Sequence, residues 1–326
     1  MTTGTPTTAV VLCAGRGTRL GDVTASTPKP LVLVGEATVL EDILGRIRLA
    51  GVEETVVTAH HLADRIEEAA RGYDGITVTV QDRLTGPAGS LVEAVTGRAP
   101  GRLLVIHGDL WSDVDLRAVL DHHERSQASA TVVAIAVDDV TPFGALAVDG
   151  GALQAIHPKG ALQGPGLVNA GIYIFETDLA ALVEDTGAEG ELDFHHLFAG
   201  LIAKGSCVSV AEHLGRWFDV GTPASLLAAN RTALDALPTA ALRAKRRGGG
   251  LWSVADGPGA DAAAPTVIGA SLVFDSATIG DGVVLSDAVI GAGVVVGEGA
   301  RVERSVLLPG SVVAPDSVVR DEVRAS

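Results

Sequence analysis

The C-terminal part of the chain carries an internal repeat. From Val267 onward an aliphatic residue returns about every six positions, followed by Gly, Asp or another small residue, in the order IGASLV, FDSATI, IGDGVV, LSDAVI, IGAGVV, VGEGAR, VERSVL, LPGSVV. This period is typical of a parallel β-helix, in which each repeat forms one side of a triangular coil. An ordinary meander of short strands is the alternative. We predict a left-handed parallel β-helix over residues 266–326, an assignment that by itself says nothing about chemistry.

Residues 8–236 follow a different pattern, in which β-branched runs alternate with helical ones. Strand composition marks residues 9–13, 54–59, 76–80, 103–106 and 131–137, and apolar residues three and four positions apart mark helices over 39–50, 62–71, 90–98 and 114–125. Runs that are apolar on both faces suit a parallel sheet covered by helices on each side. The sequence therefore predicts an α/β domain with a Rossmann-like mixed sheet.

The composition changes after Pro238. We interpret ALRAKRRGGG at 241–250 as a basic helix end, and the Gly/Asp/Ala/Pro stretch through Pro265 as a linker. The expected organisation is a first domain over residues 1–238, a linker over 239–265 and the β-helix over 266–326.

Charge and composition narrow the classes of partner. Forty acidic residues against 24 basic ones give a formal charge of −16, which argues against nucleic acid or an anionic membrane. No basic leader and no apolar run of about 18 residues is present, so a cytoplasmic protein is expected. Cys13 and Cys207 lie far apart without a CxxC pattern, which argues against a disulfide framework or a structural zinc site. The aliphatic edges of the predicted coil suggest a homo-oligomer.

A glycine-rich, basic loop follows the first predicted strand. The sequence AGRGTRL occupies residues 14–20, and PKPL occupies residues 28–31. Two glycines at the end of a parallel strand let backbone N–H groups approach a triphosphate, while Arg16, Arg19 and Lys29 supply positive charge. The loop is not a P-loop, and Leu20 stands where GxGxxG would have its third glycine.

With three further segments, this loop resembles the sugar-1-phosphate nucleotidylyltransferase family, whose members join a nucleoside triphosphate to a sugar 1-phosphate. HGDL at 107–110 is similar to the family's G-D segment, WFDVGTP at 217–223 to its D-x-G-T-P segment, and NAGIY at 169–173 to its N-x-G-I-Y strand. These motifs cover residues 8 to about 236 in the family's order. The resemblance implies that Asp109 and Asp219 hold Mg²⁺.

The same resemblance implies the chemistry of the site. The oxygen of a sugar phosphate is already ionised at neutral pH, so its attack on the α-phosphorus needs no general base. Positioning and charge neutralisation then carry the reaction. Arg19 and Lys29 are the expected catalytic residues, because they would stabilise the transition state and the leaving pyrophosphate.

The resemblance also implies a nucleotide site. The segment GPAGSL at 86–91 is similar to the form in guanylyl-transferring members, so GTP is the expected nucleotide. Gln81 would suit a thymidylyl or uridylyl branch, and an adenylyl-transferring member is a further alternative. The implied nucleotide-binding residues are Ala14, Gly15, Arg16, Gly17, Thr18, Gln81, Gly86, Gly89, Ser90 and Gly108.

The acceptor side departs from the family pattern. Gly144, Lys159 and Asn169 are implied to bind the sugar phosphate, but HPKG at 157–160 keeps only the lysine of the family's E-K-P segment. A carboxylate contact to a sugar hydroxyl is hard to replace with Pro158, which disfavours ordinary glucose or mannose phosphate. Heptose, amino sugar, N-acetylmuramic acid and cyclitol (carbasugar) phosphates stay open.

Two other functions compete with a catalytic transferase. A catalytically weak, NDP-sugar-binding regulatory homologue would be favoured by loss of Lys29, Asp109 or Asp219, and all three are present. An acyltransferase built on the coil would need a histidine, and residues 267–326 contain none. The histidine pairs at 60–61, 122–123 and 195–196 lack a zinc-type spacing, so we expect them on helix surfaces or in a substrate pocket.

Overall fold

The computed structural model describes residues 6–99, 101–176, 191–240, 244–254 and 265–326. The chain divides into two compact units, each built from two separate stretches of sequence. Unit 1 comprises residues 1–15 and 43–217, and unit 2 comprises residues 16–42 and 218–326. This division differs from the predicted domains, because the basic loop after the first strand groups with the C-terminal stretch rather than with the sheet that precedes it.

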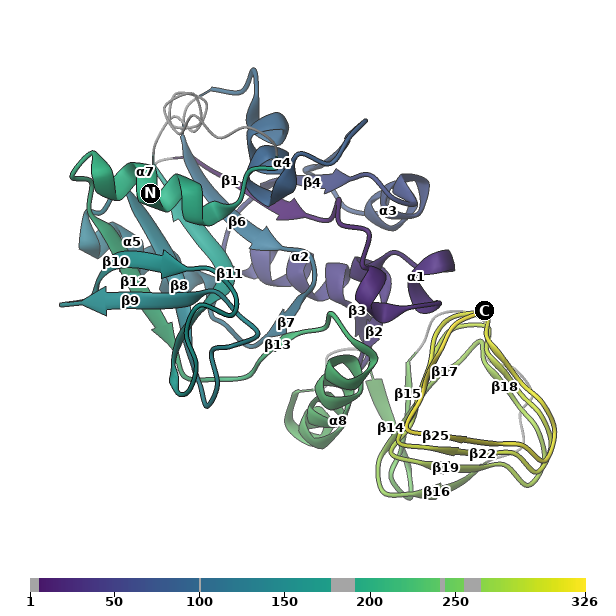
Figure 1. Cartoon of the computed structure of the whole chain (residues 1–326). Coiled ribbons are helices and arrows are strands. Elements are labelled where there is room, and N and C mark those ends of the chain that lie inside the picture. Colours follow the sequence, from purple (N-terminus) through teal and green to yellow (C-terminus); the bar gives the residue numbers. More distant parts are fainter. Residues whose placement is uncertain (1–5, 100, 177–190, 241–243, 255–264) are drawn as a thin grey trace. The chain divides into compact units, whose positions relative to one another are not determined.

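Unit 1 is built around a nine-stranded mixed sheet with the order β5-β4-β1-β6-β11-β8-β12-β10-β9 (Figure 1). Strands β5, β4, β1 and β6 run parallel, and β11 turns the direction by pairing antiparallel with both β6 and β8. The predicted Rossmann-like mixed sheet is therefore confirmed. Its strands are β1 (Thr7–Leu12), β4 (Glu54–Ala59), β5 (Ile76–Val80), β6 (Arg102–His107), β8 (Ala130–Val137), β9 (Ala145–Asp149), β10 (Ala152–His157), β11 (Gly166–Phe175) and β12 (Val208–His213).

The helices follow the predicted ones closely. The four predicted segments correspond to α2 (Val39–Leu49), α3 (Ala63–Ala70), α4 (Gly86–Val95) and α5 (Leu116–Ser126). Helix α4 begins four residues before the apolar pattern, with Pro87 in its first turn, where a missing N–H costs nothing. A further helix, α7 (Phe194–Ala203), begins at a capping box in which Asp193 and His196 exchange hydrogen bonds with each other's backbone.

Aromatic side chains fix α7 against the sheet. Tyr173 and Phe175 of β11 are fully buried, and the Tyr173 ring stacks on Phe194 with 4.2 Å between centroids. Phe175 stacks on Phe198 at 5.4 Å. Such aromatic pairs add about 0.5–1.5 kcal/mol each to the burial of their surface, so this cluster holds β11 in place beside β6.

Unit 2 begins with short elements that pack on a long helix. These are η1 (Thr18–Leu20), α1 (Val23–Ser26), η2 (Lys29–Leu31), β2 (Leu33–Val34), β3 (Ala37–Thr38) and α8 (Pro223–Ala240). Asn230 of α8 is 2% exposed and accepts a hydrogen bond from the Gly35 backbone N–H at 2.9 Å. Its amide donates to the Leu33 carbonyl at 2.8 Å, so one buried side chain joins segments about 200 residues apart.

The rest of unit 2 is the predicted left-handed parallel β-helix, drawn as a triangular coil in Figure 1. Two predictions about its start are wrong. The basic run at 245–247 lies on a strand, not on a helix end, and both β14 and β15 form inside the predicted linker and join the coil's sheet through β17. The strands are β14 (Ala244–Gly248), β15 (Leu251–Val254), β16 (Thr266–Ile268), β17 (Ser271–Phe274), β18 (Thr278–Ile279), β19 (Val284–Ser286), β20 (Val289–Ile290), β21 (Val295–Val296), β22 (Arg301–Glu303), β23 (Val306–Leu307), β24 (Val312–Val313), β25 (Val318–Arg320) and β26 (Val323–Arg324).

The coil does not keep a strict period of six. Val289 pairs with Val306, and Val306 with Val323, so successive coils lie 17 residues apart. One corner is a residue shorter because it turns through a single residue with positive φ, Asp287 in one coil and Arg304 in the next. The side chains of these corners bond between coils: Asp287 accepts from the Ala270 N–H, and Arg304 pairs with Asp321 through two hydrogen bonds of 2.7 Å.

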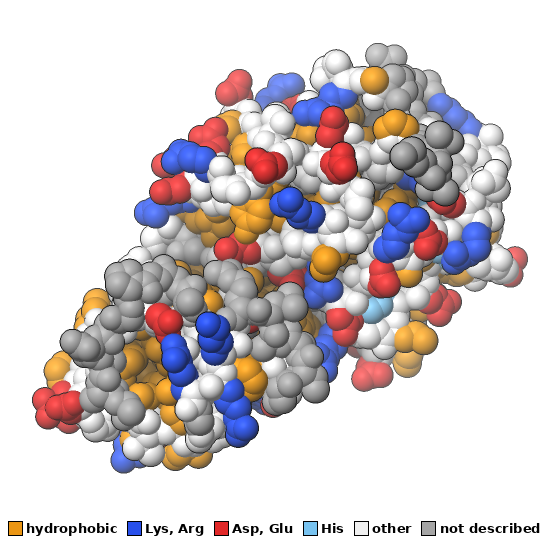
Figure 2. All heavy atoms as spheres, turned by 180° about the vertical axis from the view of Figure 1, so that it is seen from behind, with side chains coloured by type: hydrophobic (Ala, Val, Ile, Leu, Met, Phe, Trp, Pro, Cys, Tyr) orange, Lys and Arg blue, Asp and Glu red, His pale blue; other side chains and the backbone are white. Residues whose placement is uncertain are grey.

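Two surface properties bear on partners. No helix among the described residues is long and apolar enough to cross a membrane. Figure 2 shows a face on which acidic and basic side chains are interspersed rather than gathered into one continuous field of a single sign.

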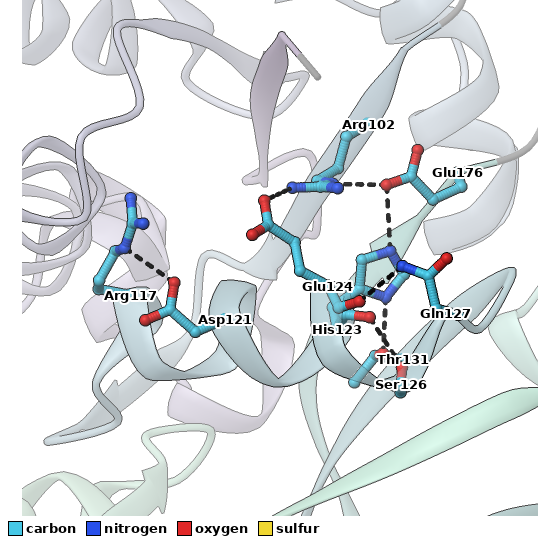
Figure 3. Close-up of polar contacts among 9 residues, drawn as sticks. All are labelled: Arg102, Arg117, Asp121, His123, Glu124, Ser126, Gln127, Thr131 and Glu176. Atoms are coloured by element: carbon cyan, nitrogen blue, oxygen red, sulfur yellow. Dashed lines mark hydrogen bonds and ion pairs between the residues drawn. The ribbon is translucent and has the colours of Figure 1, made fainter. Parts of the chain in front are cut away.

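The placement of His123 contradicts the predicted helix-surface role. Its side chain is 2% exposed on α5, with Nδ1 at 2.8 Å from the Thr131 hydroxyl and Nε2 at 3.2 Å from Glu176 Oε1 (Figure 3). Arg102 donates to the same Glu176 oxygen at 2.6 Å and to Glu124 at 2.7 Å. The network ties the start of β6, the end of β11 and helix α5 together.

Burial lowers the pKa of His123 below its ordinary value, because desolvation disfavours the imidazolium; the Glu176 hydrogen bond opposes this, and Arg102 and His122 add to it. The folded state therefore binds a proton less readily than the unfolded chain. The contribution of His123 to stability is complete above pH 6.5 and is lost as the pH falls below it.

We expect His123→Gln to flatten the fall in unfolding free energy between pH 6.5 and 5, by up to about 1.4 kcal/mol per pH unit relative to the wild type. Urea unfolding at a series of pH values measures this. His195→Gln, at a side chain that is 38% exposed, is the matched control and should follow the wild-type profile. Identical profiles for wild type and His123→Gln would contradict the assignment.

Candidate active site

The carboxyl ends of β1 and β6 meet at one edge of the sheet in unit 1. Leu12 lies opposite His107 in the parallel register, and the Gly108 N–H donates to the Leu12 carbonyl at 2.9 Å. A Cβ at Gly108 would lie 2.4 Å from Cys13 Sγ, so only glycine fits there. This approach brings the predicted residues Ala14, Gly15, Gly108 and Asp109 together.

The negative charge of Asp109 reaches two buried groups nearby. Burial raises the pKa of the Cys13 thiol well above its ordinary value, and Asp109 raises it further. Burial likewise raises the pKa of Tyr173; the hydrogen bond from Asn169 opposes this, and the charges of Asp193 and Asp109 add to it. Both the Cys13 thiol and the Tyr173 hydroxyl therefore stay neutral at neutral pH.

The predicted base-contacting segment lies at the same edge. The Gln81 N–H donates to the Ala59 carbonyl at 2.8 Å, directly after β4 and β5 end. The Gln81 side chain is 3% exposed and its amide is held inside unit 1, since Oε1 accepts from Ser90 Oγ at 2.7 Å and Nε2 donates to Glu93 at 2.6 Å. The structure thus uses both ends of this amide to position α4, and contact of Gln81 with a base stays a prediction.

Two glycines shape the start of α4. Gly86 has φ +80°, and a Cβ there would lie 2.4 Å from the Leu192 carbonyl oxygen. A Cβ at Gly89 would lie 2.7 Å from the Thr85 side chain. The hydroxyl of Thr85 is buried without a hydrogen-bond partner among the described residues. The predicted glycines therefore let the helix N-terminus approach its neighbours closely.

Unit 2 contains the basic part of the predicted site. Gly17 has φ +66°, and a Cβ there would lie 3.0 Å from Thr24 Cγ2 and 3.1 Å from Lys29 Cβ. This left-handed glycine starts η1, which carries Thr18 and Arg19, while Arg16 and Thr18 are exposed. The turn therefore packs against Lys29 and leaves the remaining polar groups open to solvent.

Arg19 and Lys29 converge on Asp219. Lys29 is 7% exposed, and its Nζ lies 3.2 Å from Asp219 Oδ1, while Arg19 Nη2 lies 3.5 Å from Asp219 Oδ2. A Cβ at Gly221 would lie 2.7 Å from both Arg19 Nη2 and Asp219 Oδ1. Glycine at this position of the D-x-G-T-P segment thus leaves room for the carboxylate and guanidinium to meet.

The predicted sugar-phosphate residues gather within unit 1. The Asn169 N–H donates to the Gly144 carbonyl at 3.0 Å, and Gly160 donates to Thr141, which brings the loop with exposed Lys159 beside the loop that leads to Gly144. Trp217 Nε1 donates to the carbonyl of Ala170 at 2.9 Å, next to Asn169.

The sequence analysis missed one series of polar side chains that contact one another. The Asn169 amide donates to the Tyr173 hydroxyl at 2.7 Å, and that hydroxyl lies 3.4 Å from His107 Nε2. A register shift in β11 around Gly171, which has φ +73°, allows this arrangement. Tyr173 and His107 stood in the recognised motifs, but only the bulge reveals that their side chains meet.

The donor set suits a divalent cation held largely by substrate. No group of three or more His, Cys, Asp and Glu side chains in the described ranges could hold a metal ion unaided. Asp109 and Asp219 offer hard carboxylate oxygens, and Mg²⁺ is usually bound by one or two carboxylates plus substrate phosphates. Each of the two residues, one in each unit, is therefore of the type that binds nucleotide-bound Mg²⁺.

Three features indicate an α/β protein that handles phosphate groups. They are the fold, the glycine turns and the cluster of Arg19, Lys29 and Asp219. Residues 8–236 match the family described as nucleotidyl transferase, which covers more than half of the chain. The chain belongs to this family.

Individual relatives agree with the family match. A Mycobacterium tuberculosis protein named mannose-1-phosphate guanylyltransferase is 30% identical over 274 residues, covering 80% of this chain and 74% of the relative. A Sulfolobus acidocaldarius relative is 27% identical over 227 residues, covering 68% of this chain but only 62% of its own length. A Bacillus anthracis chain crystallised with sucrose has a TM-score of 0.63 at 23% identity over 70% of this chain and 95% of that one, a likeness of fold.

The buried position of Lys29 generates a stability prediction. Asp219→Asn removes a negative partner from an ammonium that is almost fully buried, so we expect the free energy of unfolding to fall by about 1–3 kcal/mol. Urea unfolding followed by circular dichroism measures it. Asp235→Asn, at an exposed carboxylate on the same unit, should change stability by less than about 0.5 kcal/mol; equal effects of the two variants would count against the pairing.

Proposed function

We propose that this chain transfers a nucleotidyl group from a nucleoside triphosphate to a sugar-like 1-phosphate, giving an NDP-sugar or NDP-cyclitol and pyrophosphate. The observation that carries the proposal is the convergence of Arg19 and Lys29 on Asp219, across 200 and 190 residues of sequence. The two cations lie beside a left-handed glycine turn, and such an arrangement suits the binding of phosphate groups. Family membership over residues 8–236 supports the same reaction.

In the proposed reaction, an ionised oxygen of the sugar phosphate attacks the α-phosphorus of the nucleotide. A new P–O bond forms there while the bond from the α-phosphorus to the bridging oxygen breaks, and pyrophosphate leaves with that oxygen. Arg19, whose side chain is 57% exposed, and Lys29 neutralise charge on the transferring and leaving phosphates. Lys159 binds the sugar phosphate, and Asn169 and Gly144 orient the acceptor.

Asp109 and Asp219 hold Mg²⁺ in this proposal. The bound ion would supply charge neutralisation of the phosphates and alignment of the two substrates. The carboxylate of Asp219 also accepts from Lys29, so this residue fixes the lysine as well as contributing a ligand.

The nucleotide site uses the loop from Ala14 to Thr18 and the start of α4. Backbone N–H groups of the glycine turns face the phosphates, and Gly86, Gly89 and Gly108 keep that edge free of side chains. We take GTP as the nucleotide, supported by the guanylyl-type GPAGSL segment and by the name of the M. tuberculosis relative. A thymidylyl, uridylyl or adenylyl-transferring enzyme is the alternative, and the acceptor's identity stays open. A cytoplasmic location and a homo-oligomer belong to the same proposal.

Pyrophosphate release tests the reaction directly. Purified protein with Mg²⁺ is assayed with GTP, ATP, UTP, dTTP or CTP against hexose, heptose, amino sugar and cyclitol 1-phosphates. We expect one nucleotide and acceptor pair to exceed all others by at least about tenfold in kcat/KM, because a base or hydroxyl without its partner costs 1–3 kcal/mol. Nucleotide binding by folded protein without turnover of any pair would support the regulatory homologue instead.

Two variants test the proposed roles of residues. Asp109→Asn should reduce kcat by about a hundredfold or more, because it removes a ligand of the ion that neutralises the phosphates. Gly221→Ala should reduce kcat by about tenfold or more, because its Cβ displaces Arg19 or Asp219 from their contact. Gly72→Ala is the matched control, since a Cβ there meets nothing within 4 Å. Wild-type turnover in Asp109→Asn would remove that residue from the metal site.

A further inference from the structure

His60 directly follows β4, the strand that lies between β5 and β1 in the sheet of unit 1. The three strands run parallel, and their paired registers extend to their carboxyl ends. Segments that follow such strands meet at the same edge of a sheet. His60 therefore leaves the sheet between two segments of predicted nucleotide residues, one that starts at Ala14 after β1 and one that starts at Gln81 after β5.

Hydrogen bonds tie β4 to both of its neighbours at this edge and fix the His60 ring. The Cys13 N–H donates to Thr58 Oγ1 at 3.1 Å, which joins the ends of β1 and β4. On the other side of β4, the Gln81 N–H donates to the Ala59 carbonyl at 2.8 Å. His60 Nδ1 lies 2.7 Å from the carbonyl oxygen of Gln81. The imidazole is thus held beside the backbone of a predicted base-contacting residue.

The contact with Gln81 determines which ring nitrogen of His60 carries the proton. A carbonyl oxygen only accepts hydrogen bonds, so Nδ1 is the donor in this pair. In the neutral imidazole the other nitrogen, Nε2, then has a lone pair and acts as an acceptor. His60 is half-buried, and it makes no other hydrogen bond or ion pair within the ranges that the structure describes. Its Nε2 can therefore accept a hydrogen bond from a ligand.

The side chain of Gln81 is already occupied, in contrast to that of His60. Ser90 and Glu93 use both ends of the Gln81 amide inside unit 1, where this side chain is only 3% exposed. Turning the amide toward a ligand would break two hydrogen bonds of a buried group, which is costly. Of these two neighbours, His60 is thus the one with an unused hydrogen-bonding atom.

We infer that Nε2 of His60 accepts a hydrogen bond from the base of the bound nucleotide and that this base is guanine, an inference that rests on the proposed function. Guanine alone among the bases of the common nucleotides has two adjacent N–H donors, N1–H and the 2-amino group. In adenine and cytosine the amino group stands next to a ring nitrogen with a lone pair, and in uracil and thymine the N–H stands between two carbonyl oxygens. These neighbouring acceptors would repel the lone pair of Nε2. His60 therefore contributes to base specificity.

Equilibrium binding tests this contact without relying on turnover. Isothermal titration calorimetry on the full chain, with Mg²⁺ and without an acceptor, compares GTP with ITP, which lacks the 2-amino group, and with N1-methyl-GTP, which lacks N1–H. The wild type should bind at least one analogue about tenfold or more weakly than GTP, because Nε2 then stays unpaired. In His60→Ala the affinity for GTP should fall by about tenfold or more. The ratio between GTP and that analogue should shrink at least about fivefold, because the variant has no acceptor left to distinguish them.

Two controls separate base recognition from effects on the phosphate site and on folding. Inorganic tripolyphosphate, which has no base, should bind the wild type and His60→Ala with affinities within about twofold of each other. His122→Ala removes another half-buried histidine, whose Nε2 lies 2.8 Å from Ser209 Oγ on β12, a strand that adjoins neither β4 nor β5. This variant should keep the wild-type affinity for GTP within about twofold.

Three results would overturn the inference and leave the proposed transferase reaction standing. The first is an unchanged affinity for GTP in His60→Ala, and the second is an equal loss for GTP and both analogues, which a merely structural role would give. The third is a wild type that binds UTP or dTTP more tightly than GTP. Absence of nucleotide binding by folded wild-type protein would instead overturn the proposed function together with the role of His60.

Discussion

The carboxylate of Asp219 joins the basic loop of unit 2 to the C-terminal stretch that it packs with. Lys29 is almost fully buried, and an ammonium removed from water needs a charged partner to repay its desolvation. Asp219 supplies that partner from 190 residues further along the chain. Bringing such distant segments together costs loop entropy, which Asn230 helps to offset through its bonds to Leu33 and Gly35. The basic loop therefore belongs physically with the C-terminal stretch, although its sequence follows the first strand of the sheet.

Local pattern predicted much of this fold. Strands β4 and β5 have the predicted bounds, and the bounds of α2 and α3 lie within one residue of the predicted ones. The period of the hydrophobic residues and the turn residues determine such elements directly. The sequence predicted the coil equally well, because one inward-facing aliphatic residue on each side of the coil strongly constrains the fold. Motif spacing likewise selected Arg19, Lys29 and Asp219, which the structure brings together. In each case the decisive information lies within a few residues or in a recognisable motif.

The errors have a different cause, which is hydrogen bonding to partners that the local pattern does not reveal. His123 looks like a surface residue of α5, and only Glu176 at the end of β11 and Arg102 at the start of β6 explain its burial. The run at 245–247 looks like a helix end, yet its backbone pairs with β15 in a hairpin, and β15 in turn pairs with β17 of the coil. Intrinsic helix and strand propensities are overridden where hydrogen bonds to other parts of the fold determine the structure.

The discontinuous make-up of unit 2 has a consequence for synthesis on the ribosome. Residues 16–42 are made early, but the stretch they pack with begins only at residue 218. At about 5–20 residues per second, roughly 10–40 s separate the synthesis of Lys29 from that of Asp219. Most of unit 1 can fold during that interval. The charged side chains of the basic loop stay exposed to water until Asp219 has been made. The cluster of Arg19, Lys29 and Asp219 can thus assemble only after the last strand of the sheet, β12, has been made. A chain truncated between residues 213 and 219 would contain every strand of the sheet and still lack the cluster.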